Sequence, residues 1–397
     1  MGTSFSSPAI EAVRNKRLKL SQTALYYSAF IVLGAAYASL GPSLESLAEN
    51  TGVDIDAISI LFTARAFGYM LAAAFGSRLL DRFPAHRLIA TTFFLNAALL
   101  FTTPALPVLW ALTLVMLFLG LSLAALDIGG NAILVWVHGD QVGPYMNGLH
   151  FFAGIGAFIS PIIIGQTLTR FESITPTFQL MAVVFLPLAI WMLSLPSPKP
   201  PQSSNRVNDA TKVHPFLVIL IALFFFLYVG AESGFGGLVF TYARTRALSN
   251  EAGAAYLTSA FWGALMVGRL LSIPLAARVR PRYILFSNLL GAISSVGLMI
   301  SFPDSLVVLW IGAIGLGFFF SSMFPTILLW ADRNIPLTGQ LTGRFFVGAS
   351  LGGMTVPWLI GQFIDNIGAR SMMFTLLGDI SLGLIVFLLL LTIAKKE

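Results

Sequence analysis

The sequence predicts an all-α membrane protein with twelve transmembrane helices, arranged as two six-helix repeats of the same orientation. Of the 397 residues, 57% are hydrophobic and 10% are charged, and the mean hydropathy is +0.85. A water-soluble protein needs a larger charged surface than this. Hydrophobic stretches recur along the whole chain, and two pairs of segments are related by one constant shift. We therefore expect lipid to surround most of the chain.

Two pairs of segments repeat at a shift of 196 positions, which is close to half the length of the chain. Residues 30–41 read FIVLGAAYASLG, and residues 226–237 read FLYVGAESGFGG. Residues 153–166 and 349–362 share alanine, glycine, proline, isoleucine and a final Gly-Gln at equivalent positions. One shift common to distant pairs indicates an internal duplication.

Each hydrophobic stretch is about long enough to cross a bilayer as a helix, which takes roughly 20 residues. Because each half has an even number of helices, both halves have the same orientation, and a solute site is expected near mid-membrane between them. The expected helices cover 22–46, 56–80, 86–104, 107–137, 142–168, 174–195, 215–243, 251–277, 282–301, 305–331, 341–364 and 369–393.

The long polar segment 196–214 is rich in proline and serine and predicts a flexible linker. The expected organisation is a tail over 1–20, a six-helix half over 21–195, the linker, and a second half over 215–397. The other connections are short, and none has room for an enzyme domain or a receptor head. We expect the chain to act as a monomer.

The net charge of +6 is explained by membrane topology and not by nucleic-acid binding. With the N-terminus in the cytoplasm, 17 of the 23 Lys and Arg residues fall in cytoplasmic segments and four on the other side. This bias predicts cytoplasmic termini. We expect a multi-pass protein of the plasma membrane, in a bacterium the inner membrane. The chain has no cysteine, which excludes disulfides and thiolate metal sites.

Several motifs resemble those of the major facilitator superfamily, over nearly the whole chain. The loop that follows the second helix contains Asp81 and Arg82, and it is similar to the signature loop Gly-x-Leu-Ala-Asp-Arg-x-Gly-Arg-Lys. Further segments are similar to fucose-permease-like porters and sodium-dependent glucose transporter-like proteins: 64–69, 127–131, 144–161, 228–232 and 268–269. Fucose itself is disfavoured, because Ala153 stands near a position where fucose permeases tend to carry Asn.

Ionisable side chains inside a membrane are costly and are therefore candidates for function. Asp127 and Asn131 lie four residues apart and share a helix face, where they offer oxygen atoms to Na⁺ or a carboxylate to H⁺. The resemblance implies a coupling carboxylate here. The alternative is an ion pair between Asp127 and Arg65 that locks two helices together, and we assign Arg65 to the same cation-coupling group.

The expected substrate-binding residues lie mostly in the second half of the chain. Glu232 lies in the glycine-dense segment GAESGFGG and can accept hydrogen bonds from sugar hydroxyls. Arg269 needs a carboxylate or ligand partner, and Glu232 and Asp127 are the expected partners of the two buried arginines. Two further candidates are His150 and Asn131, which contact substrate or tune Asp127. The last two are Trp262 and Trp358, which stack on a sugar ring or serve as packing residues.

A third group of residues is expected to control gating. Asp81, with Arg82, is expected to belong to the cytoplasmic gate, where Asp81 pairs with Arg344 or caps the start of the helix over 341–364. Pro161 and Pro357 are equivalent under the repeat and allow two helices to bend. Asp379 is expected to have a packing or partnered role. Gln166 and Gln362, also equivalent, are expected to brace corresponding helix ends rather than to bind ligand.

These features predict a secondary active transporter of a small polar solute, with a sugar as the expected solute and Na⁺ or H⁺ as the coupling ion. An uncoupled facilitator or an exporter of another metabolite is the alternative within transport. A transporter-like receptor or an intramembrane enzyme is the alternative from another class. The Gly-x-Ser-x-Gly match at 348–352 lies in a predicted membrane helix, and we interpret it as helix packing. We expect no enzymatic activity and no cofactor, and beyond a possible Na⁺ at Asp127 no metal.

Overall fold

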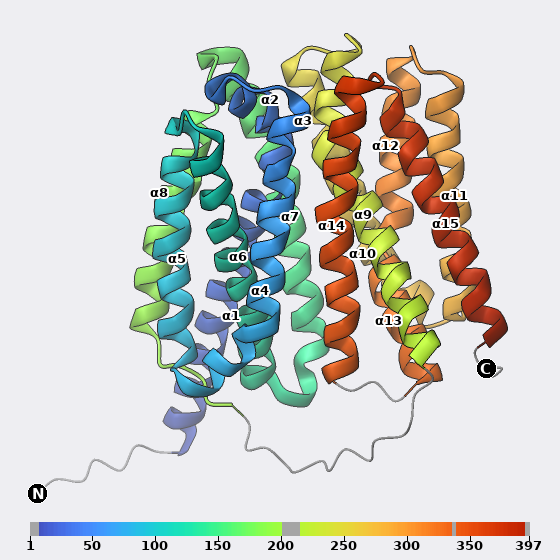
Figure 1. Cartoon of the computed structure of the whole chain (residues 1–397). Coiled ribbons are helices and arrows are strands. Elements are labelled where there is room, and N and C mark those ends of the chain that lie inside the picture. Colours follow the sequence, from blue (N-terminus) through green and yellow to red (C-terminus); the bar gives the residue numbers. More distant parts are fainter. Residues whose placement is uncertain (1–7, 201–214, 336–338, 394–397) are drawn as a thin grey trace, which may run out of the picture.

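The computed structural model describes residues 8–200, 215–335 and 339–393, and of residues 8–12, 76–79, 81, 339 and 340 it describes the backbone alone. The predicted linker and the predicted tail therefore lie largely or partly outside the described residues. The described chain consists of fifteen α-helices and two 3₁₀ turns and contains no strand. The helices stand side by side as one bundle (Figure 1).

The first half contains eight helices, and the second half contains seven. In the first half these are α1 (Pro8–Ala38), α2 (Leu40–Thr51), α3 (Ile55–Ile58), α4 (Ile60–Arg82), α5 (Ala85–Thr102), α6 (Leu109–His138), α7 (Val142–Phe171) and α8 (Thr175–Ser194), with turns η1 (Thr103–Ala105) and η2 (Gly139–Gln141). In the second half they are α9 (Pro215–Thr245), α10 (Glu251–Ala276), α11 (Pro281–Ser301), α12 (Leu306–Phe320), α13 (Met323–Asn334), α14 (Gly339–Asn366) and α15 (Ser371–Ile393).

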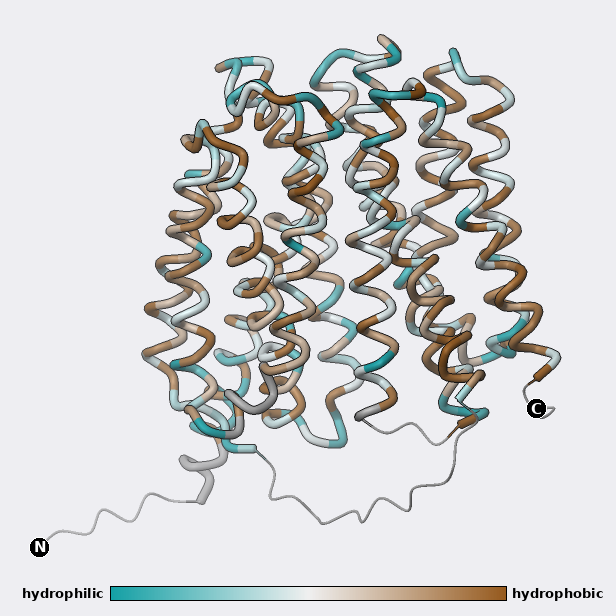
Figure 2. Tube along the Cα trace, viewed as in Figure 1, coloured by the Kyte–Doolittle hydropathy of each residue, from teal (hydrophilic) through white to brown (hydrophobic). Residues whose placement is uncertain are grey.

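The described helices form twelve membrane crossings. Eleven continuous segments are long and apolar enough to span a bilayer, and one of them, Leu109–Phe171, has 63 residues. That segment holds two crossings, because the chain reverses between α6 and α7 at η2, where Gly139 has a φ of 54°. The predicted twelve-helix membrane fold is confirmed. Figure 2 shows hydrophobic residues along the helices and hydrophilic residues concentrated at the turns.

Three predicted helices are each broken into two pieces, between α1 and α2, between α3 and α4, and between α12 and α13, and a proline explains the first and the last of these breaks. Proline has no N–H to donate to the carbonyl four residues earlier. Pro42 would otherwise bond to Ala38, where α1 ends, and Pro325 would bond to Ser321, directly after the end of α12. Each of these two breaks leaves carbonyl oxygens without an intrahelical partner, and these oxygens are used in the site described below.

The repeat is visible in how equivalent helices pack. Helix α1 packs against α7, and the equivalent α9 packs against α14. A Cβ atom on Gly156 would lie 1.8 Å from the carbonyl oxygen of Ile31, and one on Gly352 would lie 1.9 Å from that of Phe226. These equivalent glycines allow the backbones to touch, as small residues do between membrane helices.

The symmetry axis of the repeat passes between α1, α2 and α9. Tyr37 and Ser233 are equivalent positions, and their hydroxyl oxygens lie 3.3 Å apart. Gly41 and Gly237 are also equivalent, and a Cβ on Gly41 would lie 2.6 Å from the carbonyl oxygen of Gly237. Equivalent residues contact each other only where the axis relating the halves passes between them. This axis locates the centre of the molecule.

The two halves meet along two further helix pairs, α7 with α10 and α4 with α14. We call the end of the bundle where α1 begins and α15 ends the terminal face, and the other end the opposite face (Figure 1). Large apolar side chains are exposed around the bundle, among them Trp110 and Val307, which are 67% and 68% exposed. Lipid is the solvent that suits such a surface.

Candidate functional site

Asp127 is the centre of a hydrogen-bonded group inside the first half. It lies in the middle third of α6, and its carboxylate accepts two hydrogen bonds of 2.8 Å, one from the Tyr69 hydroxyl on α4 and one from the Asn131 side-chain amide. Asn131 also donates to the Asp127 backbone carbonyl at 2.8 Å. The predicted neighbourhood of Asp127 and Asn131 is confirmed, whereas Tyr69 was missed.

Arg65 does not pair with Asp127, and that predicted pairing is wrong. Its guanidinium donates to the backbone carbonyl of Tyr37 at 2.8 Å and lies 4.7 Å from the centre of the Tyr37 ring. Among the residues whose side chains are described, no carboxylate lies within 4 Å of it. The physical reason is the break between α1 and α2, which frees carbonyls at a negative helix end where a cation is stabilised.

Arg269 in α10 is held in the same way. Its Nε donates to the backbone carbonyl of Ser321 at 3.2 Å, the carbonyl that Pro325 leaves without a donor. The predicted close ion pair between Arg269 and Glu232 is not present among the described contacts. The two side chains do interact electrostatically, so Glu232 is a neighbour of Arg269 and not a direct partner.

Glu232 lies in the middle third of α9 and accepts a hydrogen bond from the hydroxyl of Tyr228, one turn earlier in the same helix. Tyr228 was missed in the sequence, although its spacing of four residues from Glu232 was visible there. A charge-assisted hydrogen bond from a tyrosine holds the carboxylate in one orientation. Glu232 is therefore presented as a fixed acceptor close to the symmetry axis.

His150 in α7 connects the charged groups of the two halves. It packs edge-on against Phe30, with ring centres 6.1 Å apart, and it interacts electrostatically with both Asp127 and Arg269. Asp127, His150, Arg269 and Glu232 thus form one electrostatic series across the interface, which we call the polar cluster. No group of three or more metal-ligating His, Cys, Asp or Glu side chains occurs in the described part of the chain.

A small cavity with room for about one water molecule lies on the symmetry axis, next to the polar cluster. We call it the axial chamber, and define it by Tyr37, Phe62, Arg65, Ser233, Gly236 and Trp262. Trp262 is thus brought to the interface between the halves, as a substrate-binding residue would be. Trp358 is 38% exposed and lines neither of the two cavities described here, so its role stays a prediction.

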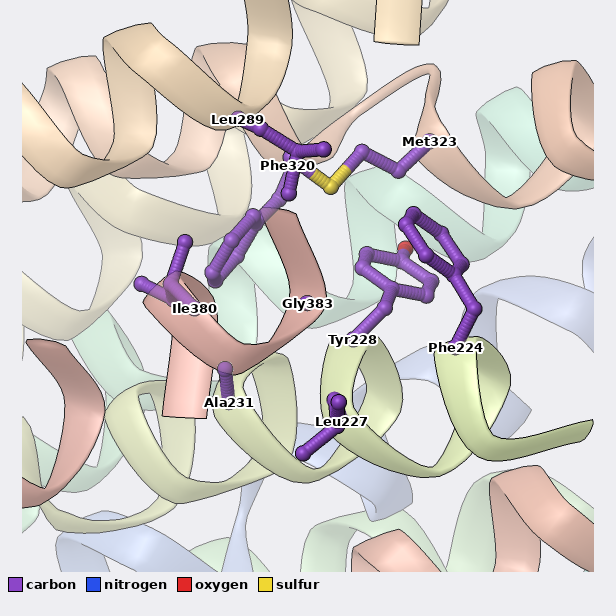
Figure 3. A pocket seen from close by; sticks show the side chains of 9 residues that line it. All are labelled: Phe224, Leu227, Tyr228, Ala231, Leu289, Phe320, Met323, Ile380 and Gly383. Atoms are coloured by element: carbon purple, nitrogen blue, oxygen red, sulfur yellow. The ribbon is translucent and has the colours of Figure 1, made fainter. Parts of the chain in front are cut away.

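A second cavity of similar size lies inside the second half and has a different character. Figure 3 shows its labelled side chains, which are apolar apart from the hydroxyl of Tyr228. It is lined by Phe224, Leu227, Tyr228, Ala231, Leu289, Phe320, Met323, Ile380 and Gly383. A polar solute finds few hydrogen-bonding groups there, so the axial chamber and the polar cluster are the better candidate site.

Asp379 lies in α15, away from the interface between the halves. Its side chain is 9% exposed, and its Oδ2 atom has no hydrogen-bond partner among the described residues. No charged group in the described part of the chain forms an ion pair with it. Of the two predicted roles, the structure therefore favours packing over partnership.

The predicted gating residues are only partly described. The side chain of Asp81 lies outside the described residues, so its predicted pairing with Arg344 stays a prediction, and Arg82 and Arg344 are both exposed. Pro161 and Pro357 are buried inside the continuous helices α7 and α14. Their predicted role in bending is not tested by a single conformation.

Comparison with known proteins identifies the family. Residues 26–357 match the Major Facilitator Superfamily. The chain belongs to this superfamily. It is 32% identical over 355 residues to "Sodium-dependent glucose transporter 1" of Xenopus laevis, covering 82% of this chain and 72% of that protein. It is 29% identical over 373 residues to "Sodium-dependent glucose transporter 1A" of Mus musculus, covering 84% and 88%.

Solved structures of the superfamily share the fold. A mutant of the nucleoside transporter NupG superposes with a TM-score of 0.75 at 15% identity, covering 95% of this chain and all of that one. The unmutated NupG superposes with a TM-score of 0.70 at 13% identity, covering 96% and 100%. The superfamily is one of transporters and not a class of enzymes.

Transporters of this superfamily work by rocking one half against the other, and here the halves are joined at the opposite face. Asp365 accepts a 2.7 Å hydrogen bond from the backbone N–H of Asp56, and Gln362 donates to the Asp56 carbonyl at 2.7 Å. Gln166 donates to the hydroxyl of Tyr256. The two glutamines therefore join the halves near corresponding helix ends, in agreement with the bracing role predicted for them.

We call these contacts between the halves at the opposite face the closed gate. An ion pair between Glu45 and Arg244, 3.8 Å apart, adds to it. Two further hydrogen bonds between the halves, from Tyr37 to Ser233 and from Thr63 to the Met354 carbonyl, lie deeper in the bundle. The structure is thus closed toward the opposite face, between the axial chamber and the surrounding water.

Weakening the closed gate is expected to expose the axial chamber from the opposite face. The double variant D365A/Q362A removes two hydrogen bonds, together about 2–4 kcal/mol. Since about 1.4 kcal/mol corresponds to a tenfold change, labelling should accelerate by at least roughly tenfold. The measurement is the rate at which a membrane-impermeant maleimide labels Ser233→Cys, in a chain with no other cysteine.

The matched control is Arg246→Ala at the same face. Arg246 pairs with Asp304 inside the second half and does not cross to the first. Its loss should leave the labelling rate unchanged. Equal labelling rates in the control and the double variant would show that the contacts at Asp56 do not hold the gate closed.

Proposed function

We propose that the protein is a secondary active transporter that moves a sugar by alternating access, coupled to Na⁺ or H⁺. The observation that carries this proposal is the polar cluster, in which a hydrogen-bonded carboxylate of one half and a carboxylate of the other face a shared interface at mid-depth. Relatives named sodium-dependent glucose transporter support both the solute class and the coupling.

Asp127 is the proposed coupling residue. Its carboxylate already accepts bonds from Tyr69 and Asn131, and the Asn131 side-chain oxygen is a further ligand for a hard cation such as Na⁺. A proton would instead neutralise the carboxylate and displace one of the two donors. Either ion removes negative charge beside His150, which faces Arg269 in the other half. Cation binding would thereby change the attraction across the interface that rocking must break.

Glu232, held by Tyr228, is the proposed acceptor for solute hydroxyls, with Arg269 as a nearby donor. The two carboxylates then have separate tasks, since Asp127 senses the cation and Glu232 orients the solute. Glu232 lies close to the symmetry axis, and Asp127 interacts with His150 of α7, which packs against the second half, so a change in either can alter the balance between conformations.

The expected setting of the protein follows from the same proposal. Both termini would lie in the cytoplasm, so that the closed gate faces outward and the structure represents a state closed to the outside. The chain would act as a monomer in a plasma membrane (the inner membrane in a bacterium), without enzymatic activity and without nucleic acid as a partner.

The experiment that tests this function is uptake into proteoliposomes, with a panel of labelled sugars and with Na⁺ and pH gradients imposed separately. Accumulation of a sugar above its external concentration under one gradient supports the proposal and identifies the ion. Uptake that only equilibrates would indicate an uncoupled facilitator. Binding of a sugar without any uptake would indicate a receptor.

Replacing Glu232 with glutamine is expected to weaken sugar binding by about 10- to 100-fold. A hydrogen bond to a charged group contributes roughly 1.5–3 kcal/mol, and about 1.4 kcal/mol corresponds to a tenfold change in affinity. The measurement is the Kd of the transported sugar by isothermal titration. The control is Glu251→Gln, which changes a carboxylate at the start of α10, on the opposite face. An unchanged Kd in E232Q would remove Glu232 from the solute site.

A further inference from the structure

The axial chamber surrounds the guanidinium of Arg65, which is half-buried. It lies on the symmetry axis between the polar cluster and the closed gate, and in this conformation it has room for about one water molecule. Glycines keep it open, because a Cβ on Gly236 would lie 2.6 Å from Cζ2 of Trp262. A Cβ on Gly237 would likewise lie 2.7 Å from Cε1 of Phe62. Two similar halves thus meet around a space that a single methyl group would begin to fill.

The positive charge of Arg65 is not neutralised inside this chamber. A guanidinium has five N–H donors, and one of its nitrogens donates to the Tyr37 carbonyl. The Tyr37 and Phe62 rings cover it, with ring centres 4.7 Å and 5.9 Å from Cζ. None of the carboxylates with described side chains lies within 4 Å of it. A half-buried charge without a counter-charge has lost part of its hydration without compensation, so the geometry favours a negative group beside Arg65.

Trp262 provides a second, independent indication of a ligand. Its side chain is 7% exposed, and its Nε1–H, which can only donate, has no partner among the described residues. The Tyr37 hydroxyl and the Ser233 hydroxyl bond to each other at 3.3 Å, which leaves one of their two protons for a ligand. The chamber is therefore lined by three kinds of hydrogen-bond donor, namely the Arg65 guanidinium, the Trp262 N–H and a hydroxyl group. The backbone carbonyl of Tyr37 already accepts a hydrogen bond from Arg65.

We propose that the axial chamber is an anion-binding subsite of the solute pathway, and that the anionic group is the carboxylate of an acidic sugar such as a hexuronate. This inference rests on the proposed sugar transport and specifies its substrate class. Arg65 and the Trp262 N–H suit a carboxylate, and the Trp262 ring suits the apolar face of a sugar ring once the halves rock apart. A free chloride ion offers the same charge and is the other source that the experiment must separate.

The test is ligand binding to the purified full-length protein, with D-glucuronate, D-glucose and chloride as probes and methanesulfonate as the inert anion. D-Glucuronate should bind in chloride-free buffer, and Arg65→Gln should weaken that binding at least about thirtyfold, as expected for a lost charge-assisted contact. Trp262→Phe removes only one N–H and should weaken it about five- to tenfold. The affinity for D-glucose should change less than about threefold in either variant.

A chloride titration distinguishes the two sources of the anion. Competition between chloride and D-glucuronate in the unmodified protein, lost in Arg65→Gln, places both at one subsite and supports the proposal. If chloride binding depends on Arg65 but D-glucuronate does not bind, the anion subsite stands and the acidic sugar is overturned as its ligand. If Arg65→Gln binds both anions as tightly as the unmodified protein, the subsite itself is overturned. The same follows if this variant weakens D-glucose binding as much as D-glucuronate binding.

Two controls keep these outcomes separate from misfolding and from failure of the transport proposal. Arg65→Lys retains the charge and should recover part of the D-glucuronate affinity, while a folded Arg65→Gln variant must elute as one species on size exclusion. Uptake of neutral sugars without any anion binding would overturn this inference and leave transport standing. Anion binding that depends on Arg65, found without any sugar uptake, would support the anion subsite and overturn the proposed transport.

Discussion

Replacing Asp127 with asparagine is expected to abolish concentrative uptake while leaving exchange of sugar across the membrane intact. One charge moving through 100 mV releases about 2.3 kcal/mol, which supports roughly fortyfold accumulation at about 1.4 kcal/mol per tenfold. Without the carboxylate no cation is carried with the solute, so the accumulation ratio should fall to about one. The measurement is the steady-state ratio of internal to external sugar in proteoliposomes, together with counterflow at equal concentrations.

The fold should survive this substitution, because an amide has the shape of a carboxylate and can still bond to Tyr69 and Asn131. We expect the free energy of unfolding to change by about 1 kcal/mol or less. The matched control is Asp379→Asn, which neutralises another intramembrane acid away from the interface. Gradient-driven accumulation by D127N, or its loss in D379N alone, would contradict the coupling role of Asp127.

Replacing Gly156 with alanine is expected to destabilise the fold by about 3 kcal/mol or more. The new Cβ would lie 1.8 Å from the backbone carbonyl oxygen of Ile31, so α1 and α7 must separate and lose contacts along their length. Overpacking costs about 1–3 kcal/mol where side chains can adjust, and here the obstacle is backbone. The measurement is the midpoint of thermal unfolding in detergent, followed by the fraction of monodisperse protein.

The repeat provides a second instance of this prediction and the chain provides a control. Gly352 is the equivalent of Gly156, and its Cβ would lie 1.9 Å from the Phe226 carbonyl oxygen, so G352A should be similarly damaging. Gly297 in α11 has no atom within 4 Å of its Cβ position. G297A should be neutral or stabilise by roughly 0.5–1 kcal/mol through helix propensity. Equal midpoints for G156A and G297A would show that the α1–α7 contact tolerates separation.

Much of the fold was predictable because its signals are local. Hydropathy determined the twelve crossings, and the constant shift of 196 identified which helices are equivalent. The breaks after Ala38 and Phe320 were missed, although Pro42 and Pro325 each remove a hydrogen bond four residues earlier. That signal was present in the sequence, since each break lies at or next to the carbonyl that lost its donor.

The partners of the charged side chains were harder to predict. Matching each arginine to a carboxylate was reasonable from charge alone, yet Arg65 and Arg269 donate to the carbonyls of Tyr37 and Ser321. Those acceptors exist because of helix breaks in a different part of the chain from each arginine. Tyr69 reaches Asp127 from another helix, so no spacing in the sequence connects the two.

The sequence by itself determined that this protein crosses the membrane twelve times in two equivalent halves, and that Asp127, Glu232 and Asp379 are acids within membrane-spanning helices. Only the tertiary structure decided that the symmetry axis runs between Tyr37 and Ser233, that Arg65 faces a chamber without a counter-charge, and that Gln166 and Gln362 join the halves. The physical reason is that insertion into lipid depends on the summed hydrophobicity of neighbouring residues in one helix. A hydrogen bond instead needs two atoms within about 3 Å, and in this fold those atoms come from distant helices.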